Sequence, residues 1–445
     1  MALRMTATKP NPALVTLPWQ LSLEEWGDDV VVPLPRGISR HIVRIVRLGE
    51  DVYAVKQTRE QWAHREYRLL RDLRRLSLPT VEPVGVVSGR RTEDDREIEP
   101  ALVTRHLQYS LPYRSLFSHG LPQDSLPKIV DALVVLLVRL HLAGFWWGDV
   151  SLSNVLFRRS AGEFAAYLVD AETGELHETL SDGQRMHDLD VALTNIYGEL
   201  LDLQAGGFLS ESFDPDTIVD RLQERYDGLW SELTGTEEFT THEIWRIEQR
   251  MERLNELGFD VDELDIVTDW DGATVRVQPK VVEADHHARE LQTLTGLDVE
   301  ENQARRLLND IAAFTAHHDL GGESRSIVAH RWLTTVYEPI TAMVPPTLRG
   351  RLEPAEVFHE ILEHRWFLSE RSGSPVHTVD AARSYIETVL SARPEEAIAG
   401  PDPAEPDATT ELSASELATA AELAAVEELE PEGLSADAPG PPRRG

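Results

Sequence analysis

The sequence predicts an α+β protein in which a small β-rich lobe is followed by a helical lobe, a second mostly helical domain and a disordered acidic tail. Three observations support this class. Strand-like alternation and turn signals are concentrated between residues 37 and 104, whereas helical periodicity dominates from residue 128 to 392. From residue 394 the chain is rich in Ala, Glu and Pro and has no aromatic residue, which is typical of disorder. A chain of 445 residues is long enough for two or three domains with their own cores.

The first predicted domain spans residues 31–210 and follows a leader, residues 1–30. Residues 37–56 indicate a hairpin, because apolar residues alternate on both sides of Gly49-Glu50-Asp51. A helix is expected over 61–76, where apolar residues recur on one face. The other elements expected in this domain are strands over 80–87, 99–104, 155–157 and 165–169 and helices over 128–143 and 186–203.

The second predicted domain, residues 211–393, consists mainly of long amphipathic helices with one hairpin over 264–279. Its later helices are expected over 284–296, 300–318, 327–343, 354–369 and 378–392. The tail, residues 394–445, carries 13 acidic and 2 basic residues. It lacks the apolar side chains that offset the entropy of folding, so we expect it to be disordered.

The composition excludes several classes of protein. The chain has no cysteine, so disulfides and thiolate metal sites are excluded and a reducing compartment is expected. The N-terminus shows no secretory signal, and the longest apolar run, residues 132–138, is too short to span a bilayer, so we expect a cytoplasmic protein. A net charge of −34 argues against a general affinity for nucleic acid or anionic lipid. Residues 36–75 nevertheless hold 11 Arg and Lys against 5 Asp and Glu, which suits either an anionic ligand or a solvated helix face.

The stretch FWWGDVSLSNVLF, residues 145–157, places one carboxylate beside bulky aromatic residues and an amide five residues later. A solvated loop would explain Asp149 and Asn154 but not the aromatic residues. A buried core would explain the aromatic residues but would leave the carboxylate costly to desolvate. A catalytic loop with an aromatic wall explains both features.

Five residues occur in an order that resembles the protein-kinase-like superfamily, from about residue 36 to 203. They are Lys56 in YAVK, Glu66 in HREYRLL, Asp149 and Asn154 in WGDVSLSN, and Asp170 in YLVDAETG. Within this superfamily the chain is most similar to bacterial lipopolysaccharide-type (Kdo/WaaP-like) and other small atypical kinases. The chain has only four lysines against 39 arginines, so the lysine at the end of a predicted strand points to a need for a compact ammonium.

The resemblance implies an ATP- and Mg²⁺-dependent site with a role for each of these residues. Lys56 would hold the nucleotide phosphates and Glu66 would keep the ammonium in place. Asp149 would accept or orient the proton of the attacking hydroxyl. Asn154 and Asp170 would supply oxygen ligands to Mg²⁺. Taken singly, each residue also has a structural explanation as a strand-end charge, an exposed helix residue or a turn residue, and only their common order favours a site.

The chain departs from the family pattern at several positions. The phosphate-covering loop is only PRGISRH, in which Gly37, Ser39 and backbone N–H groups would have to contact the nucleotide, or which is an ordinary turn into a strand. Trp147 stands where related loops carry His, which we interpret as a packing substitution. Glu172, in Asp170-Ala171-Glu172, is either a further metal ligand or a solvated turn residue.

The segment after Asp170 is short. About twenty residues separate it from Asp188 and Asp190, which leaves little room to dock a peptide and favours a small-molecule, sugar or lipid-headgroup acceptor. One of these two carboxylates is expected to support the Asp149 loop from below, although a helix N-terminal charge would explain either.

Residues 241–392 resemble a bacterial domain family of unknown function that follows such kinase-like domains. The stretches that carry this resemblance are EIWRIEQRMERLNELGFDVDELD, VQPKVVEADHHARELQTLTGLDVEENQARRLLND and EPAEVFHEILEHRWFLSE. His359 and His364 are five residues apart, about 140° around a helix, so they do not form a zinc-binding pair and are expected to pack or cap. Arg305, Arg306 and Arg331 could bind an anion but are better explained as helix-surface charge.

Three functions are consistent with the sequence. The first is a phosphotransferase that uses ATP and Mg²⁺, with a helical C-terminal domain for acceptor binding or for a protein partner. The second is a catalytically inactive pseudokinase that acts as a nucleotide-binding scaffold or regulator. The third is nucleotidyl transfer at the same residues. The complete set of five residues favours the phosphotransferase, whereas the phosphate-covering loop, which has only one glycine, favours the pseudokinase scaffold.

Overall fold

The computed structural model describes most of the chain. The described residues are 3–8, 11–32, 41–49, 51–118, 125–210, 213–235, 237–240, 244–256, 259–260, 263–268, 274–280 and 283–396. Gly37, Ser39 and the predicted tail beyond its first three residues lie outside these ranges.

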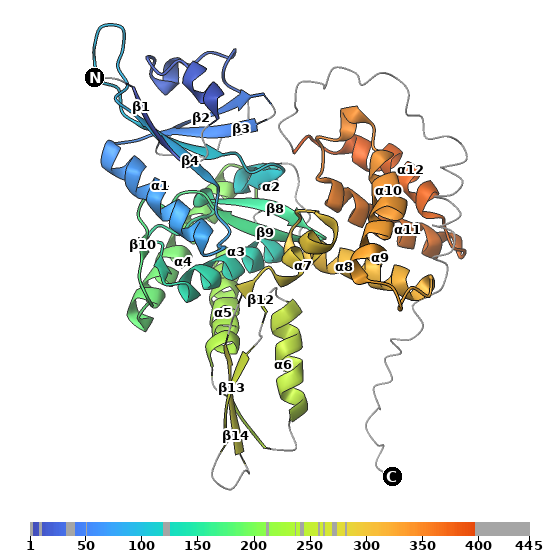
Figure 1. Ribbon diagram of the computed structural model, residues 1–445. Helices are drawn as coiled ribbons and strands as arrows, with labels where there is room; N and C mark the ends of the chain where they lie inside the picture. Colours follow the sequence, from blue (N-terminus) through green and yellow to red (C-terminus); the bar gives the residue numbers. More distant parts are fainter. Residues whose placement is uncertain are drawn as a thin grey trace.

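The N-terminal lobe is an antiparallel sheet of five strands in the order β1-β4-β5-β3-β2, with helix α1 (Glu60–Arg75) beside it (Figure 1). The strands are β1 (Arg4–Ala7), β2 (Ile42–Leu48), β3 (Asp51–Gln57), β4 (Pro83–Ser88) and β5 (Ala101–Arg105). Val46 and Val55 point to one face of the sheet, where they pack with Trp19 and Trp26. The opposite face of β2 and β3 is therefore free to line a cavity between the lobes.

The segment expected as a leader takes part in this lobe. Its first residues form β1, which pairs with β4 and was not predicted from the sequence. Two short 3-10 helices follow, η1 (Pro12–Thr16) and η2 (Leu23–Glu25), and Leu14 and Leu23 are buried. The short length of β1 explains the miss, because four residues carry little periodic signal.

The C-terminal lobe is mainly helical and begins after an interlobe linker, residues 106–109. Its helices are α2 (Tyr113–Ser118), α3 (Ser125–Leu142), α4 (Asp182–Ala205) and α5 (Pro215–Thr234). Its strands are β6 (Ser110–Pro112), β7 (Phe145–Trp146), β8 (Val155–Ser160), β9 (Glu163–Leu168) and β10 (Glu175–Leu176). β6, β8 and β9 form one antiparallel sheet, and β7 pairs with β10. Helix α3 is apolar on nearly all sides and lies in the core of this lobe.

Helix α5 packs against α3, so the apolar core of this lobe continues beyond residue 210 and reaches Leu254 and Phe259. After α5 the chain forms further elements, of which α6, β13 and β14 lie at the bottom of Figure 1. They are β11 (Glu237–Thr240), α6 (Ile244–Glu256), β12 (Phe259–Asp260), β13 (Glu263–Thr268), β14 (Thr274–Lys280) and β15 (Glu283–Ala284). The predicted hairpin over 264–279 is the β13–β14 pair.

The remaining helices surround a second apolar core that includes Trp332, Tyr337 and Phe358. They are α7 (His286–Thr295), α8 (Glu301–His317), α9 (Arg325–Trp332), α10 (Glu338–Ala342), α11 (Pro354–Ser372) and α12 (Thr378–Thr388), with 3-10 helices η5 (Pro346–Leu348) and η6 (Leu390–Ala392). The predicted helix over 327–343 is interrupted by a π-helical turn, η4 (Leu333–Tyr337). Pro339 follows this turn and explains it, because proline has no N–H and its ring clashes with the preceding turn.

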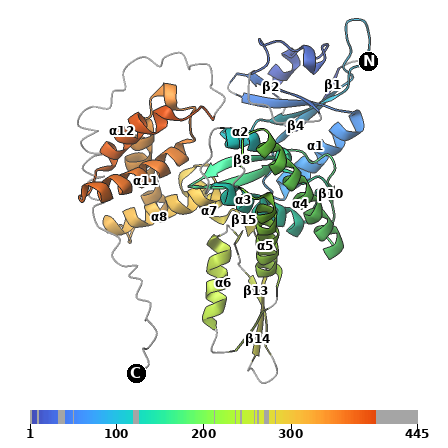
Figure 2. The ribbon, with the colours of Figure 1, turned by 180° about the vertical axis from the view of Figure 1, so that it is seen from behind.

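Figures 1 and 2 show this helical group beside the C-terminal lobe, with the N-terminal sheet above. The arrangement confirms the predicted α+β class with a β-rich lobe, a helical lobe and a helical C-terminal part. The predicted domain limits remain predictions. No helix within the described ranges has the length and apolar content needed to cross a membrane.

Candidate active site

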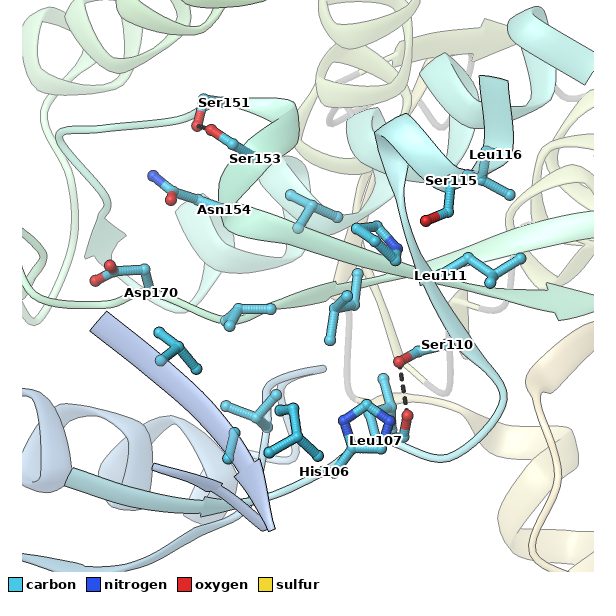
Figure 3. Close-up of a pocket in the computed structure, with 18 of the residues that line it drawn as sticks. His106, Leu107, Ser110, Leu111, Ser115, Leu116, Ser151, Ser153, Asn154 and Asp170 are labelled. Atoms are coloured by element: carbon cyan, nitrogen blue, oxygen red, sulfur yellow. Dashed lines mark hydrogen bonds between the residues drawn. The ribbon is translucent and has the colours of Figure 1, made fainter. Parts of the chain in front are cut away.

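A cavity of about 1430 Å³ lies between the two lobes. Its wall combines β2 and β3, the interlobe linker, the loop before β8 and the residues that follow β9. Figure 3 shows Asn154 and Asp170 at one end and His106, Leu107 and Ser110 at the other. Lys56, Asp149, Asn154 and Asp170, which are far apart in the sequence, all line it. The fold therefore brings four of the predicted site residues to one cavity.

Lys56 is the centre of a buried charge cluster. Its side chain is only 11% exposed, and its Nζ lies 3.0 Å from Glu66 Oε2 and 2.7 Å from Asp170 Oδ2. Glu66 does not line the cavity but is buried on α1 and reaches Lys56 from behind. Burial alone would lower the pKa of Lys56, but the Glu66 and Asp170 carboxylates outweigh burial and raise this pKa above its ordinary value. The ammonium therefore stays charged in spite of its burial.

Asp170 and Asn154 offer oxygen atoms to the same cavity as Lys56. Asp170 Oδ1 accepts a hydrogen bond from the Glu172 backbone N–H at 3.0 Å, which fixes the carboxylate at the end of β9. Oxygens of Glu66, Asp170 and Glu172 lie within 4.8 Å of one another. A set of carboxylate and amide oxygens fits Mg²⁺, which prefers hard ligands. The residues present are thus suited to the implied metal.

Two amides hold the Asp149 carboxylate. Asn195 Nδ2 lies 3.3 Å from Asp149 Oδ1 and donates to the Val150 carbonyl at 3.0 Å. Asn154 Nδ2 donates to the Asp149 carbonyl at 2.8 Å and lies 3.4 Å from Asp149 Oδ2. The carboxylate is therefore oriented at the cavity wall.

Helix α4 supports the whole Asp149 loop. Asp188 is fully buried and accepts hydrogen bonds from the backbone N–H groups of Trp147 and Gly148 at 2.8 and 2.7 Å. Glu199 accepts from the N–H groups of Leu152 and Ser153 at 2.7 and 3.0 Å. Of the two candidate carboxylates it is Asp188 that supports the loop, since Asp190 is exposed.

The aromatic residues of the loop lie behind it. Trp147 is fully buried, and its Nε1 donates to the Asp170 carbonyl at 2.8 Å, so it links the Asp149 loop to the end of β9. The Trp146 ring covers Gly148, where a Cβ atom would come within 2.9 Å of the ring and where φ is +78°. Among the described residues around the cavity neither indole is part of the wall. The expected aromatic wall of Asp149 is therefore wrong: Trp147 is buried in the core behind the loop, and the half-buried Trp146 stacks on His187 of α4.

Several residues of the site were not predicted from the sequence. Asn195 and Glu199 could have been found, because Asp188, Asn195 and Glu199 are spaced seven and four residues apart and so share one face of a helix. His41, at the start of β2, contacts Glu172 with 2.9 Å between Nε2 and Oε2. Glu172 also lies 3.3 Å from Lys56 Nζ, so it is held in an ion pair with the lysine and is not a solvated turn residue. Nothing in the sequence pattern pointed to this contact.

The C-terminal part of the chain also reaches the cavity. Val389, Ala392 and residues 393–396 line its end remote from Asn154. Glu396 is buried and pairs with Arg159 of β8 at 2.9 Å. Arg159 lies on β8, which begins directly after Asn154, and the five residues between the two positions correspond to about 16 Å of extended chain. The helical C-terminal part therefore contributes to the cavity at the linker end and not at the Asp149 end.

Comparison with known proteins agrees with this site. Residues 41–197 match the lipopolysaccharide kinase (Kdo/WaaP) family. Residues 228–390 match the domain of unknown function DUF4032. Both resemblances expected from the sequence are thereby confirmed. No curated protein matches the chain.

The solved structures similar to this chain include one described as "WaaP in complex with acyl carrier protein". It is 17% identical, and the similarity covers 57% of this chain and 99% of that chain with a TM-score of 0.34. A likeness at this level adds no argument about function, so the family match and the geometry of the cavity carry the interpretation.

Proposed function

We propose that the chain is an ATP- and Mg²⁺-dependent phosphotransferase that acts on a hydroxyl of a small molecule, a sugar or a lipid headgroup. The observation that carries this proposal is the position of Lys56 between Glu66 and Asp170, in the same cavity as Asp149 and Asn154. The family match to residues 41–197 supports kinase-like chemistry. Availability of ATP agrees with the cytoplasmic location expected from the sequence.

Each residue then has a role in positioning or charge neutralisation, which are the main requirements of phosphoryl transfer. Lys56 contacts nucleotide phosphates, and Glu66 keeps its ammonium in the cavity. Asn154 and Asp170 would hold Mg²⁺, which supplies positive charge to the phosphate oxygens when bound. Asp149 accepts or orients the proton of the acceptor hydroxyl, and its two amide contacts fix the direction of its carboxylate.

The size of the acceptor follows from the segment after Asp170. This segment is short, and it is fastened by the β10–β7 pair and by a hydrogen bond from Arg65 to the Gly174 carbonyl at 2.9 Å. A peptide acceptor needs an extended docking surface at this place, so a small acceptor fits better. A protein partner of the C-terminal part remains compatible with this proposal.

The test is transfer from γ-labelled ATP in the presence of Mg²⁺ to a metabolite and lipid extract, followed by identification of the labelled product. We expect a labelled hydroxyl compound that does not form when Asp149 is changed to Asn. Nucleotide binding without any transfer would reject the proposal in favour of a pseudokinase. Label in the product from α-labelled ATP, used in a parallel reaction, would indicate nucleotidyl transfer instead.

A further inference from the structure

The start of β2 places a histidine on the Lys56 face of the N-terminal sheet. Val43 is paired with Lys56 across β2 and β3, and directly opposed side chains in an antiparallel pair lie on the same face. His41 is two residues before Val43, so the period-two alternation directs it to that face as well. His41 also lines the cavity. Sheet register and cavity geometry therefore agree on the direction of the imidazole.

His41 and Lys56 contact the same carboxylate oxygen. Glu172 Oε2 lies 2.9 Å from His41 Nε2 and 3.3 Å from Lys56 Nζ. Glu172 belongs to the C-terminal lobe, so its carboxylate bridges from one lobe to two nitrogen atoms of the other. Nitrogen donors that converge on one anionic oxygen are also the arrangement with which proteins hold a phosphate oxygen.

The sequence before β2 explains why a side-chain donor is useful here. Loops with several glycines hold phosphates through backbone N–H groups, whereas this chain has the single glycine Gly37 in PRGISRH. His41 is the last residue of this short stretch. An imidazole at this position can donate to a phosphate oxygen that backbone groups of a richer glycine loop would otherwise bind.

We propose that His41 is a phosphate-binding residue of the nucleotide site and that the Glu172 carboxylate competes with a nucleotide phosphate for the same nitrogen atoms. The proposal rests on the nucleotide site of the proposed function. The phosphate group of a nucleotide and the Glu172 carboxylate compete for His41 and Lys56. Loss of the imidazole therefore weakens binding of phosphate groups, and loss of the Glu172 charge strengthens it.

The test is calorimetric titration of the full chain with ADP and with adenosine, at constant pH and with EDTA present so that no metal contributes. His41→Ala should weaken ADP binding about tenfold, the size expected for one charge-assisted hydrogen bond, and leave adenosine binding unchanged. Glu172→Gln should strengthen ADP binding at least about threefold, again without an effect on adenosine, because Gln removes the competing charge. His64→Ala is the matched control, since this histidine of α1 does not line the cavity.

The outcomes separate the possibilities. Equal weakening of ADP and adenosine in His41→Ala would mean a structural role, and no change for either ligand would also overturn the proposal. Weaker ADP binding by Glu172→Gln, whether with EDTA alone or only after Mg²⁺ is added, would reject the proposed competition between the Glu172 carboxylate and the nucleotide phosphate. If the wild-type protein binds neither compound, the proposed function fails and the proposal falls with it. Should His41→Ala not fold, as judged by thermal unfolding, His41→Asn with the same pair of ligands gives the comparison.

Discussion

Asp149 shows at the scale of one residue how the cavity combines access with orientation. The carboxylate lines the cavity, yet two amide groups, from Asn154 and Asn195, lie within hydrogen-bonding distance of its oxygens. A general base needs a fixed direction toward the proton that it accepts, because proton transfer requires hydrogen-bond geometry. The two amides supply that direction without removing the negative charge.

Asp149→Asn keeps the size and hydrogen-bonding reach of the side chain but removes its charge and basicity. We expect ATP affinity to stay within about twofold of the wild-type value, because the Lys56 cluster is unchanged, while transfer falls at least ~10²-fold, the low end for loss of a general base. Single-turnover transfer and equilibrium ATP binding measure both quantities. Full transfer by this variant would show that Asp149 is not the base.

At the scale of elements, helix α4 acts as the support of the Asp149 loop. Asp188, Asn195 and Glu199 lie on one face of this helix and bind successive parts of the loop through backbone and side-chain contacts. Each loop N–H that donates to the Asp188 or Glu199 carboxylate avoids the cost of a buried donor without a hydrogen bond. The loop conformation therefore depends on the position of the helix as a whole.

Asn195→Ala removes one of the two amides that orient Asp149 and leaves the nucleotide contacts in place. We expect the transfer rate to decrease about tenfold, which corresponds to an activation free energy higher by ~1.4 kcal/mol when Asp149 is less well oriented. ATP affinity should not change. Asn195→Asp should be worse, since it places a second carboxylate beside Asp149 and removes the donor. The transfer rates of the two variants, compared at equal thermal stability, test this. Equal rates for wild type and Asn195→Ala would show that Asn154 suffices.

His141 connects α3 to α4 in the core of the lobe, where its Nε2 lies 3.1 Å from Asp188 and its Nδ1 2.5 Å from the Tyr226 hydroxyl. Burial lowers the pKa of His141 below its ordinary value of 6.5. As the pH falls below 6.5, the unfolded chain binds a proton that the folded protein does not, so the free energy of unfolding decreases.

Urea unfolding at pH 7.5 and 5.5 checks this direction. We expect the wild type to lose more stability across this interval than His141→Gln, by on the order of 1 kcal/mol. His330→Gln, on an exposed position of α9, should keep the pH dependence of the wild type. A wild-type protein that becomes more stable at pH 5.5 relative to His141→Gln would contradict the neutral buried state.

At the scale of the whole molecule, the helical C-terminal part is joined to the C-terminal lobe by a charged interface. Arg158 of β8 contacts Glu300 at 2.8 Å and Glu353 at 2.5 Å, and all three side chains are largely buried. Glu356 accepts a hydrogen bond from the Ala161 N–H at 2.8 Å. Buried charges are neutralised only when their partners lie in one arrangement, so these contacts fix the helical C-terminal part relative to the C-terminal lobe. They thereby also fix residues 389–396 at the cavity.

Arg158→Met leaves Glu300 and Glu353 buried without their cation. We expect a loss of about 3–5 kcal/mol in the free energy of unfolding, the range for breaking a buried ion pair from one side. The matched control is Arg383→Met, whose partner Asp380 is a surface residue and whose loss should cost less than about 1 kcal/mol. Chemical unfolding of both variants measures the difference. Similar small losses for both would show that the interface does not depend on Arg158.

The position of Glu396 sets where the chain can be shortened. A chain that ends after Glu396 keeps the Arg159 pair and the hydrogen bond from the Glu396 N–H to the Gly350 carbonyl at 3.0 Å. We expect its melting temperature to equal that of the full chain within about 1 °C, because residues 397–445 have no aromatic residue and only seven Ile, Leu and Val side chains to bury. A chain that ends after Ala392 loses this pair and the Arg393–Glu360 pair and should melt several degrees lower. Equal melting of the two shortened chains would mean that these contacts add no stability.

The sequence by itself determined the order of the elements and the identity of the central charges. Periodicity located β2, β3, α1, α3 and α4 to within a few residues, because long regular elements carry a repeated apolar signal. Lys56, Glu66, Asp149, Asn154 and Asp170 were recognised from their order and from the elements between them. Local patterns and residue types are properties of neighbours in the chain, so no folded structure was needed to read them.

The tertiary structure alone decided which side chains meet. The contact of His41 with Glu172 joins residues more than a hundred positions apart, and the pair of Asn195 with Asp149 depends on how α4 crosses the loop. The same is true of the Arg159–Glu396 pair, which brings the end of the helical part to the cavity. Even Trp146 and Trp147 were assigned from the sequence to the wrong side of the Asp149 loop. Such contacts depend on the packing of distant elements, and a pattern along the chain contains no distance between elements that are not neighbours.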